Sequence, residues 1–84
     1  MKGIRVKVLY FAQAREAAGV GREELVLPAE ASVSALVAKS LGLHGRLGSV
    51  AGSMKVAVNE EIADPDQRLS DGDEVAFLPP VAGG

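Results

Sequence analysis

"IRVKVLYF", residues 4–11, carries the strongest structural signal in the chain. Its side chains alternate between two faces, as they do in a β-strand. One face carries Ile4, Val6, Val8 and Tyr10, and the other carries Arg5, Lys7, Leu9 and Phe11. The pattern predicts a strand with its first face in the core. The second face begins charged and turns apolar at Leu9 and Phe11. We therefore expect another part of the chain or a partner to pack against this end of the strand.

The residues that follow predict a short helix, a second strand and a longer helix. "AQAREAAG", residues 12–19, is rich in helix formers and closes on glycine. "REELVLP", residues 22–28, alternates as a short strand ending at proline. Residues 32–42 have apolar side chains at helical spacing. We expect Ser32 to cap this helix and Gly42 to stop it.

The C-terminal half predicts further strands separated by connections. Residues 43–53 are rich in Gly and Ser and are expected to form a loop. Residues 54–59 form a short strand, with a brief return strand at Ile62. The last strand, "EVAFL" at 74–78, turns Phe77 inward and Leu78 outward. This order predicts an α+β fold, a sheet with one main helix packed on one face.

Composition limits the functions that the chain can have. The 84 residues predict a single domain over 1–84. The chain has no Cys and one His, His44, which excludes zinc–thiolate sites and predicts no metal site. His44 is interpreted as an incidental loop residue. The net charge is −2 without a Lys/Arg cluster, so we expect no nucleic-acid partner. No signal peptide or membrane segment is evident, and a cytoplasmic location is predicted.

The chain ends in "PPVAGG", which predicts an extended, mobile arm over residues 79–84. Two prolines favour an extended backbone, and two terminal glycines fit a channel too narrow for a Cβ atom. The reactive group of such an arm is the carboxylate of Gly84. This carboxylate is ionised at neutral pH and a poor electrophile. A partner protein must therefore activate it.

An apolar patch is expected beside this arm. If the first and last strands are neighbours in the sheet, Leu9, Phe11 and Leu78 come together on the face away from the helix. An exposed apolar patch beside a mobile arm indicates a surface that docks on a partner.

The two ends of the sequence also resemble a known family. "VLYFAQAREAAG" near the start and "DGDEVAFLPPVAGG" at the finish closely resemble the small, sulfur-carrying subunits of molybdopterin synthases. The likeness covers nearly the whole chain. It implies a β-grasp, ubiquitin-like fold with a mixed sheet of about five strands, in which the first and last strands are parallel neighbours.

The resemblance implies a function for the arm. An ATP-dependent adenylyltransferase of the ubiquitin-activating type would adenylate Gly84, behind Gly83, and a sulfurtransferase would convert it to a thiocarboxylate. The large synthase subunit, in a heterotetramer of two small and two large subunits, would pass the sulfur to cyclic pyranopterin monophosphate (precursor Z) to build the molybdopterin dithiolene. The chain would bind no cofactor itself, since ATP is used by the activating partner. The catalytic groups would lie on the large subunit.

The resemblance also implies which residues contact these partners. Arg15, within "FAQARE", matches a position that makes polar contacts in the family; its alternative role is a solvated helix residue. The position of Leu78 often carries an aromatic residue there. The partner-binding residues expected are Leu9, Phe11, Arg15, Phe77, Leu78, Pro79, Pro80, Val81 and Ala82.

Three alternatives remain open at this point. The thiamine-pathway sulfur carrier shares the Gly-Gly end but is usually shorter and lacks the "FAQARE" opening and the Pro-Pro pair. A ubiquitin-like modifier that serves tRNA thiolation is also compatible with Gly-Gly. The third is an interaction domain whose end does no covalent chemistry.

Overall fold

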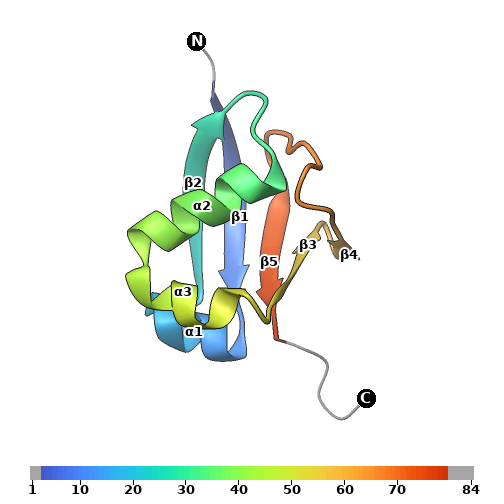
Figure 1. Ribbon diagram of the computed structural model, residues 1–84. Coiled ribbons are helices and arrows are strands. Elements are labelled where there is room, and N and C mark those ends of the chain that lie inside the picture. The colour runs from blue at the N-terminus through green and yellow to red at the C-terminus, as the bar shows by residue number, and fades with distance from the viewer. Residues whose placement is uncertain (1–2, 80–84) are drawn as a thin grey trace.

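The computed structural model describes residues 3–79 and contains one mixed sheet of five strands. The strands are β1 (Gly3–Tyr10), β2 (Arg22–Pro28), β3 (Lys55–Val58), β4 (Glu61–Ile62) and β5 (Glu74–Leu78). Their order across the sheet is β2-β1-β5-β3-β4 (Figure 1). β1 and β5 are parallel, and every other neighbouring pair is antiparallel.

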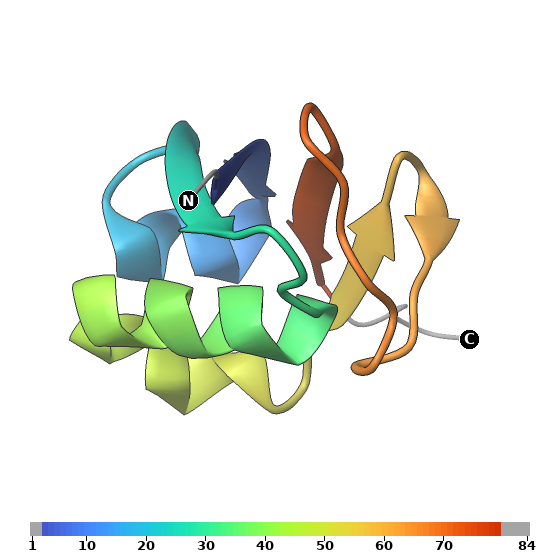
Figure 2. The ribbon, with the colours of Figure 1, turned by 90° about the horizontal axis from the view of Figure 1, so that it is seen from above.

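The helices gather on one face of this sheet, and no described element covers the other face (Figure 2). They are α1 (Ala12–Ala18), α2 (Val33–Leu43), the 3₁₀ turn η1 (Gly45–Leu47) and α3 (Gly48–Ala51). α1 and α3 lie at the end of the sheet where β1 and β5 finish (Figure 1). This is the β-grasp arrangement, so the predicted α+β fold is confirmed. We call the uncovered side the open face.

The core lies between the sheet and the helices, where the alternation of the strands places it. The inward side chains of β1 and β5 are buried, as the sequence pattern predicts. They meet Leu36 of α2 and Leu47 of η1, which are both fully buried. The largest fully buried side chains are Tyr10, Phe77, Leu36, Leu47, Val6, Val8, Val75 and Ser40.

Helix ends follow the expected chemistry at two positions and depart from it at a third. The Ser32 hydroxyl accepts a hydrogen bond from the Ala35 backbone N–H at 3.2 Å, which caps α2. Gly19 ends α1 with a φ of 80°. The predicted stop at Gly42 is wrong: α2 continues to Leu43, and His44 forms its C-cap.

The expected loop over residues 43–53 is also wrong, since most of it is helical. η1 and α3 follow α2 almost without a break. Leu47 supplies the reason, because its buried side chain holds this segment against the core. Burial of one leucine contributes about 1.5–3 kcal/mol, which offsets a helix-propensity cost of about 1 kcal/mol for each glycine.

Candidate functional site

The last residues of β1 and β5 bring the predicted patch residues together. Leu9 is the register partner of Ala76, and Tyr10 is that of Phe77. The backbone N–H of Phe11 donates to the Phe77 carbonyl at 3.3 Å, which continues the pairing past the end of β1. Leu9 and Leu78 are half-buried, whereas Phe11 is 43% exposed. The expected pairing of the first and last strands is therefore confirmed, and it places Leu9, Phe11 and Leu78 at one end of the open face. Their contact with a partner stays a prediction.

Phe77 is a correction to the predicted partner contacts. Its side chain is 1% exposed and stacks on Tyr10, with ring centroids 5.3 Å apart. A side chain this deeply buried cannot touch a partner protein. Phe77 instead anchors the end of β5 in the core, directly before Leu78 and the exposed Pro79. The remaining arm residues of the prediction, Pro80, Val81, Ala82, Gly83 and Gly84, lie outside the described residues.

Ile62 joins this surface and was missed at the sequence level. It lies on β4, is 61% exposed, and is the register partner of Ala57. Ala57 in turn pairs with Ala76 on β5, so one apolar row crosses β1, β5, β3 and β4. A strand of two residues has too little alternation to reveal its faces. We define the apolar patch as Leu9, Phe11, Ile62, Ala76 and Leu78.

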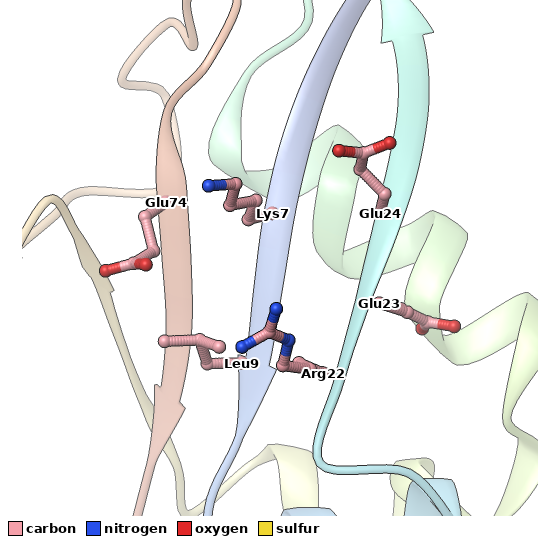
Figure 3. A pocket seen from close by; sticks show the side chains of 6 residues that line it. All are labelled: Lys7, Leu9, Arg22, Glu23, Glu24 and Glu74. Carbon is pink, nitrogen blue, oxygen red and sulfur yellow. The ribbon is translucent and has the colours of Figure 1, made fainter.

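Charged side chains occupy the adjoining part of the open face (Figure 3). Lys7 is the register partner of Glu24 on β2 and of Glu74 on β5. Arg22 on β2 is the register partner of Leu9, and its side chain lines the same hollow as Lys7. The open face is thus apolar where the arm begins and charged farther along the strands.

Arg15 lies on α1 at the edge of the patch. Its side chain is exposed and passes over Gly21, the residue before β2. Among residues 3–79, its guanidinium forms no ion pair. Arg15 is therefore placed where it can reach a partner, as the resemblance implies, although the contact itself stays a prediction.

A polar network lies behind the patch, inside the helical layer. The Tyr10 hydroxyl donates to Glu23 Oε2 at 2.6 Å and lies 3.2 Å from Ser40 Oγ. Glu23 Oε2 also bonds His44 Nε2 at 2.7 Å. Burial, together with the bond to Glu23, raises the pKa of Tyr10 well above its usual value. His44 thus has a structural partner and is not incidental, which corrects the sequence-based interpretation.

The side chains of residues 3–79 form no cluster of metal ligands, and the helices in this range are short. No three potential ligand side chains in this range lie close enough together to hold a metal ion. None of the helices in this range is long and apolar enough to cross a bilayer. The candidate site is the apolar patch, the charged surface beside it and the start of the arm at Pro79.

Comparison with known proteins shows the family to which this chain belongs. A model of the ThiS family matches residues 8–84. The molybdopterin synthase sulfur carrier subunit of Chlamydomonas reinhardtii is 41% identical over 83 residues, which cover 96% of this chain and 100% of the relative.

Two solved structures share the fold closely. A putative molybdopterin converting factor, subunit 1, from Pyrococcus furiosus superposes with a TM-score of 0.87 at 35% identity, over 93% of this chain and 99% of that one. A second, from a complex of subunits 1 and 2 of the Helicobacter pylori molybdopterin-converting factor, gives a TM-score of 0.69 at 29% identity, over 96% and 100% of the two chains. The chain therefore belongs to the ThiS family and, within it, to the molybdopterin synthase sulfur carrier subunits.

Proposed function

We propose that this chain carries sulfur as a thiocarboxylate on Gly84 and delivers it inside the active site of the large synthase subunit. The observation that carries the proposal is the apolar patch at the ends of β1 and β5, directly beside the root of the arm. A docked patch would hold Pro79 close to the partner, and the six residues from Pro79 to Gly84 span at most about 20 Å when extended. The solved complex of subunits 1 and 2 of the Helicobacter pylori molybdopterin-converting factor supports association of such a chain with a second subunit.

Loading the arm requires two partner enzymes. An adenylyltransferase of the ubiquitin-activating type uses ATP: a Gly84 carboxylate oxygen attacks the α-phosphorus, and pyrophosphate leaves. The product is an acyl-adenylate, a mixed anhydride whose carbonyl carbon is a good electrophile. A sulfurtransferase then supplies sulfur at the oxidation level of sulfide, which displaces AMP. The absence of Cys suits a carrier of this kind, since the sulfur resides on the chain end.

Unloading takes place on the large subunit, in a heterotetramer of two small and two large subunits. The thiocarboxylate is a soft nucleophile: its sulfur forms a bond to a carbon of cyclic pyranopterin monophosphate, while a C–O bond at that carbon breaks and its oxygen leaves with the phosphate or as water. Hydrolysis of the resulting thioester leaves the sulfur on the pterin and restores the Gly84 carboxylate. Two such transfers supply the two sulfur atoms of the dithiolene. The catalytic groups for these steps belong to the large subunit, and this chain contributes the sulfur and its placement.

Intact-mass analysis of the chain from its native cell tests this proposal. We expect a population in which one oxygen of the terminal glycine is replaced by sulfur, together with a co-purifying large subunit. Deleting Gly84 should abolish sulfur transfer but leave folding and binding of the large subunit unchanged. A chain with extra residues after Gly84, shown not to be trimmed, should also lose sulfur transfer. Normal dithiolene formation by the extended chain would contradict the proposal, and thiazole synthase as the co-purifying protein would favour the thiamine pathway.

A further inference from the structure

Two arginines flank exposed apolar side chains at the end of the sheet where the arm begins. One shallow hollow is lined by Phe11, Val20, Arg15 and Arg22, and both apolar side chains are exposed. Glu16 lines the adjoining hollow on α1. Within residues 3–79, neither arginine forms an ion pair with a carboxylate of the chain. The hollow therefore presents two available guanidinium groups beside apolar surface.

Gly21 sets the position of Arg15. A Cβ atom built on Gly21 would lie 3.4 Å from Arg15 Nε and 3.6 Å from Arg15 Cζ. A methyl group at this position would make ordinary van der Waals contact, whereas the outer atoms of a branched side chain would need the space that the guanidinium occupies. The small residue at position 21 thus lets Arg15 lie against the turn that leads into Arg22.

Arg22 connects this hollow with the open face. It is the register partner of Leu9, and Figure 3 shows its guanidinium lying over the sheet near that leucine. Farther along the same face, Lys7 lies between Glu24 and Glu74 in register, so its charge is compensated by its neighbours. The excess of positive charge on this surface therefore lies at the Arg22 end, next to the apolar patch.

We propose that Arg22 acts together with Arg15, for which the resemblance already implies a polar contact, to bind an acidic segment of the large synthase subunit, a segment that carries a carboxylate beside an apolar side chain. The inference rests on the proposed function, and it names the chemistry of the partner at one part of the docking surface. Phe11 belongs to both the apolar patch and the hollow, so a single partner surface covers them together. Guanidinium groups beside apolar surface bind carboxylates with defined geometry and attract an acidic partner during association.

Binding of the purified large subunit to variants of the full chain tests the proposal. Calorimetry at low and high salt gives the Kd of each pair. We expect Arg22→Gln and Gly21→Val each to weaken binding about three- to tenfold at low salt, with a smaller difference at high salt. Gly21→Val should have no further effect in an Arg15→Gln background, because it acts by displacing Arg15.

Two matched controls separate this effect from general changes. Gly21→Ala fits beside Arg15 and should bind like the unaltered chain. Arg46→Gln removes the same charge from an exposed position on η1 and should also leave binding unchanged. Thermal unfolding of each variant checks that the fold is intact.

The outcomes distinguish the inference from the function on which it rests. Equal Kd values for Arg22→Gln and Arg46→Gln, or for Gly21→Val and Gly21→Ala, would overturn the inference while the sulfur-carrier function stands. Failure of the unaltered chain to bind the large subunit would overturn the proposed function, and the inference with it.

Discussion

Two residues in the turn between β3 and β4 hold backbone angles that favour glycine. Asn59 has a φ of 50° and Glu60 a φ of 74°. Two-residue hairpin turns with both φ angles positive prefer Asn-Gly, since other side chains are strained there. Asn59 suits its place, because its side chain accepts a bond from the Glu74 N–H and donates one to Asp73 Oδ1. Glu60 has no described side-chain bond to offset its strain.

Replacing Glu60 by glycine should therefore stabilise the protein. Relief of backbone strain outweighs the extra freedom that glycine gives the unfolded chain, so we expect a gain of about 0.5 kcal/mol. In a domain of this size such a gain raises Tm by about 2–4 °C. Glu61→Gly is the matched control: Glu61 lies in β4 without a positive φ, and glycine there should lower Tm. Lower Tm values for both variants would contradict the strain at Glu60.

The network of Tyr10, Glu23 and His44 could not be predicted from the sequence. Alternation along β1 correctly placed Tyr10 on the core face. His44, however, stands alone in a glycine-rich stretch, and its partner Glu23 lies 21 positions earlier. Only the packing of α2 against β2 brings the two side chains together. Local patterns carry no signal for such a pair.

This network predicts a loss of stability in strong alkali. Burial raises the pKa of Tyr10 in the folded state above the value of about 10 in the unfolded chain. Above that pH the unfolded state binds fewer protons than the folded state, so stability falls by up to about 1.4 kcal/mol per pH unit. Tyr10→Phe should remove this part of the decline in a series of Tm values against pH.

Phenolate absorbance gives a direct check, because Tyr10 is the only tyrosine of the chain. We expect no phenolate signal at about pH 10–11 while circular dichroism still reports the folded state. A folded protein whose tyrosine ionises near its ordinary pKa would refute the assignment.

At the scale of elements, sequence patterns predict a strand or helix correctly where the periodic stretch is long. They fail where contacts with the rest of the fold determine the local structure. All five strands and the capped α2 helix follow from alternation, helical spacing and Ser32. η1 and α3 do not, because Gly and Ser in residues 43–53 favour a loop locally. The predicted helix end at Gly42 was wrong for the same reason, because α2 continues through Gly42 to Leu43 and the chain then leads to the buried Leu47.

Truncation of Leu47 tests how much this helical segment depends on its anchor. Leu47 is fully buried and contributes to the main core cluster. We expect Leu47→Ala to lower the free energy of unfolding by about 2–5 kcal/mol in urea titration. Leu43→Ala removes the same atoms from an exposed side chain four positions earlier, and a change within about 0.5 kcal/mol is expected. Similar losses for the two variants would show that the segment is not held by Leu47.

At the scale of the whole molecule, we propose that the apolar patch binds the partner and that the arm carries the chemistry, as two separable parts of one function. The sequence identified Leu9 and Phe11 because the outward face of the first strand changes from charged to apolar. It identified Leu78 because this residue faces outward on the last strand. The parallel pairing that joins them followed from the family resemblance, because periodicity does not define strand neighbours. Ile62 extends the patch to the edge strand β4, and only the register through Ala57 places it there.

A charge placed in the patch should therefore impair docking without unfolding the chain. Phe11 is exposed and forms the N-cap of α1, a position where aspartate is favourable, so Phe11→Asp should fold normally. Its carboxylate would be buried on docking, and we expect the Kd for the large subunit to rise at least about tenfold.

Val26→Asp supplies the control for this change. Val26 is 55% exposed on the same open face, but it lies on β2 in register with Arg5, away from the arm. Its substitution should leave Kd unchanged, whereas equal weakening by both variants would mean that the partner covers the whole face. Deletion of Gly84 makes the complementary change, since it should preserve Kd and abolish sulfur transfer. These two results together would assign binding to the patch and the chemistry to the arm.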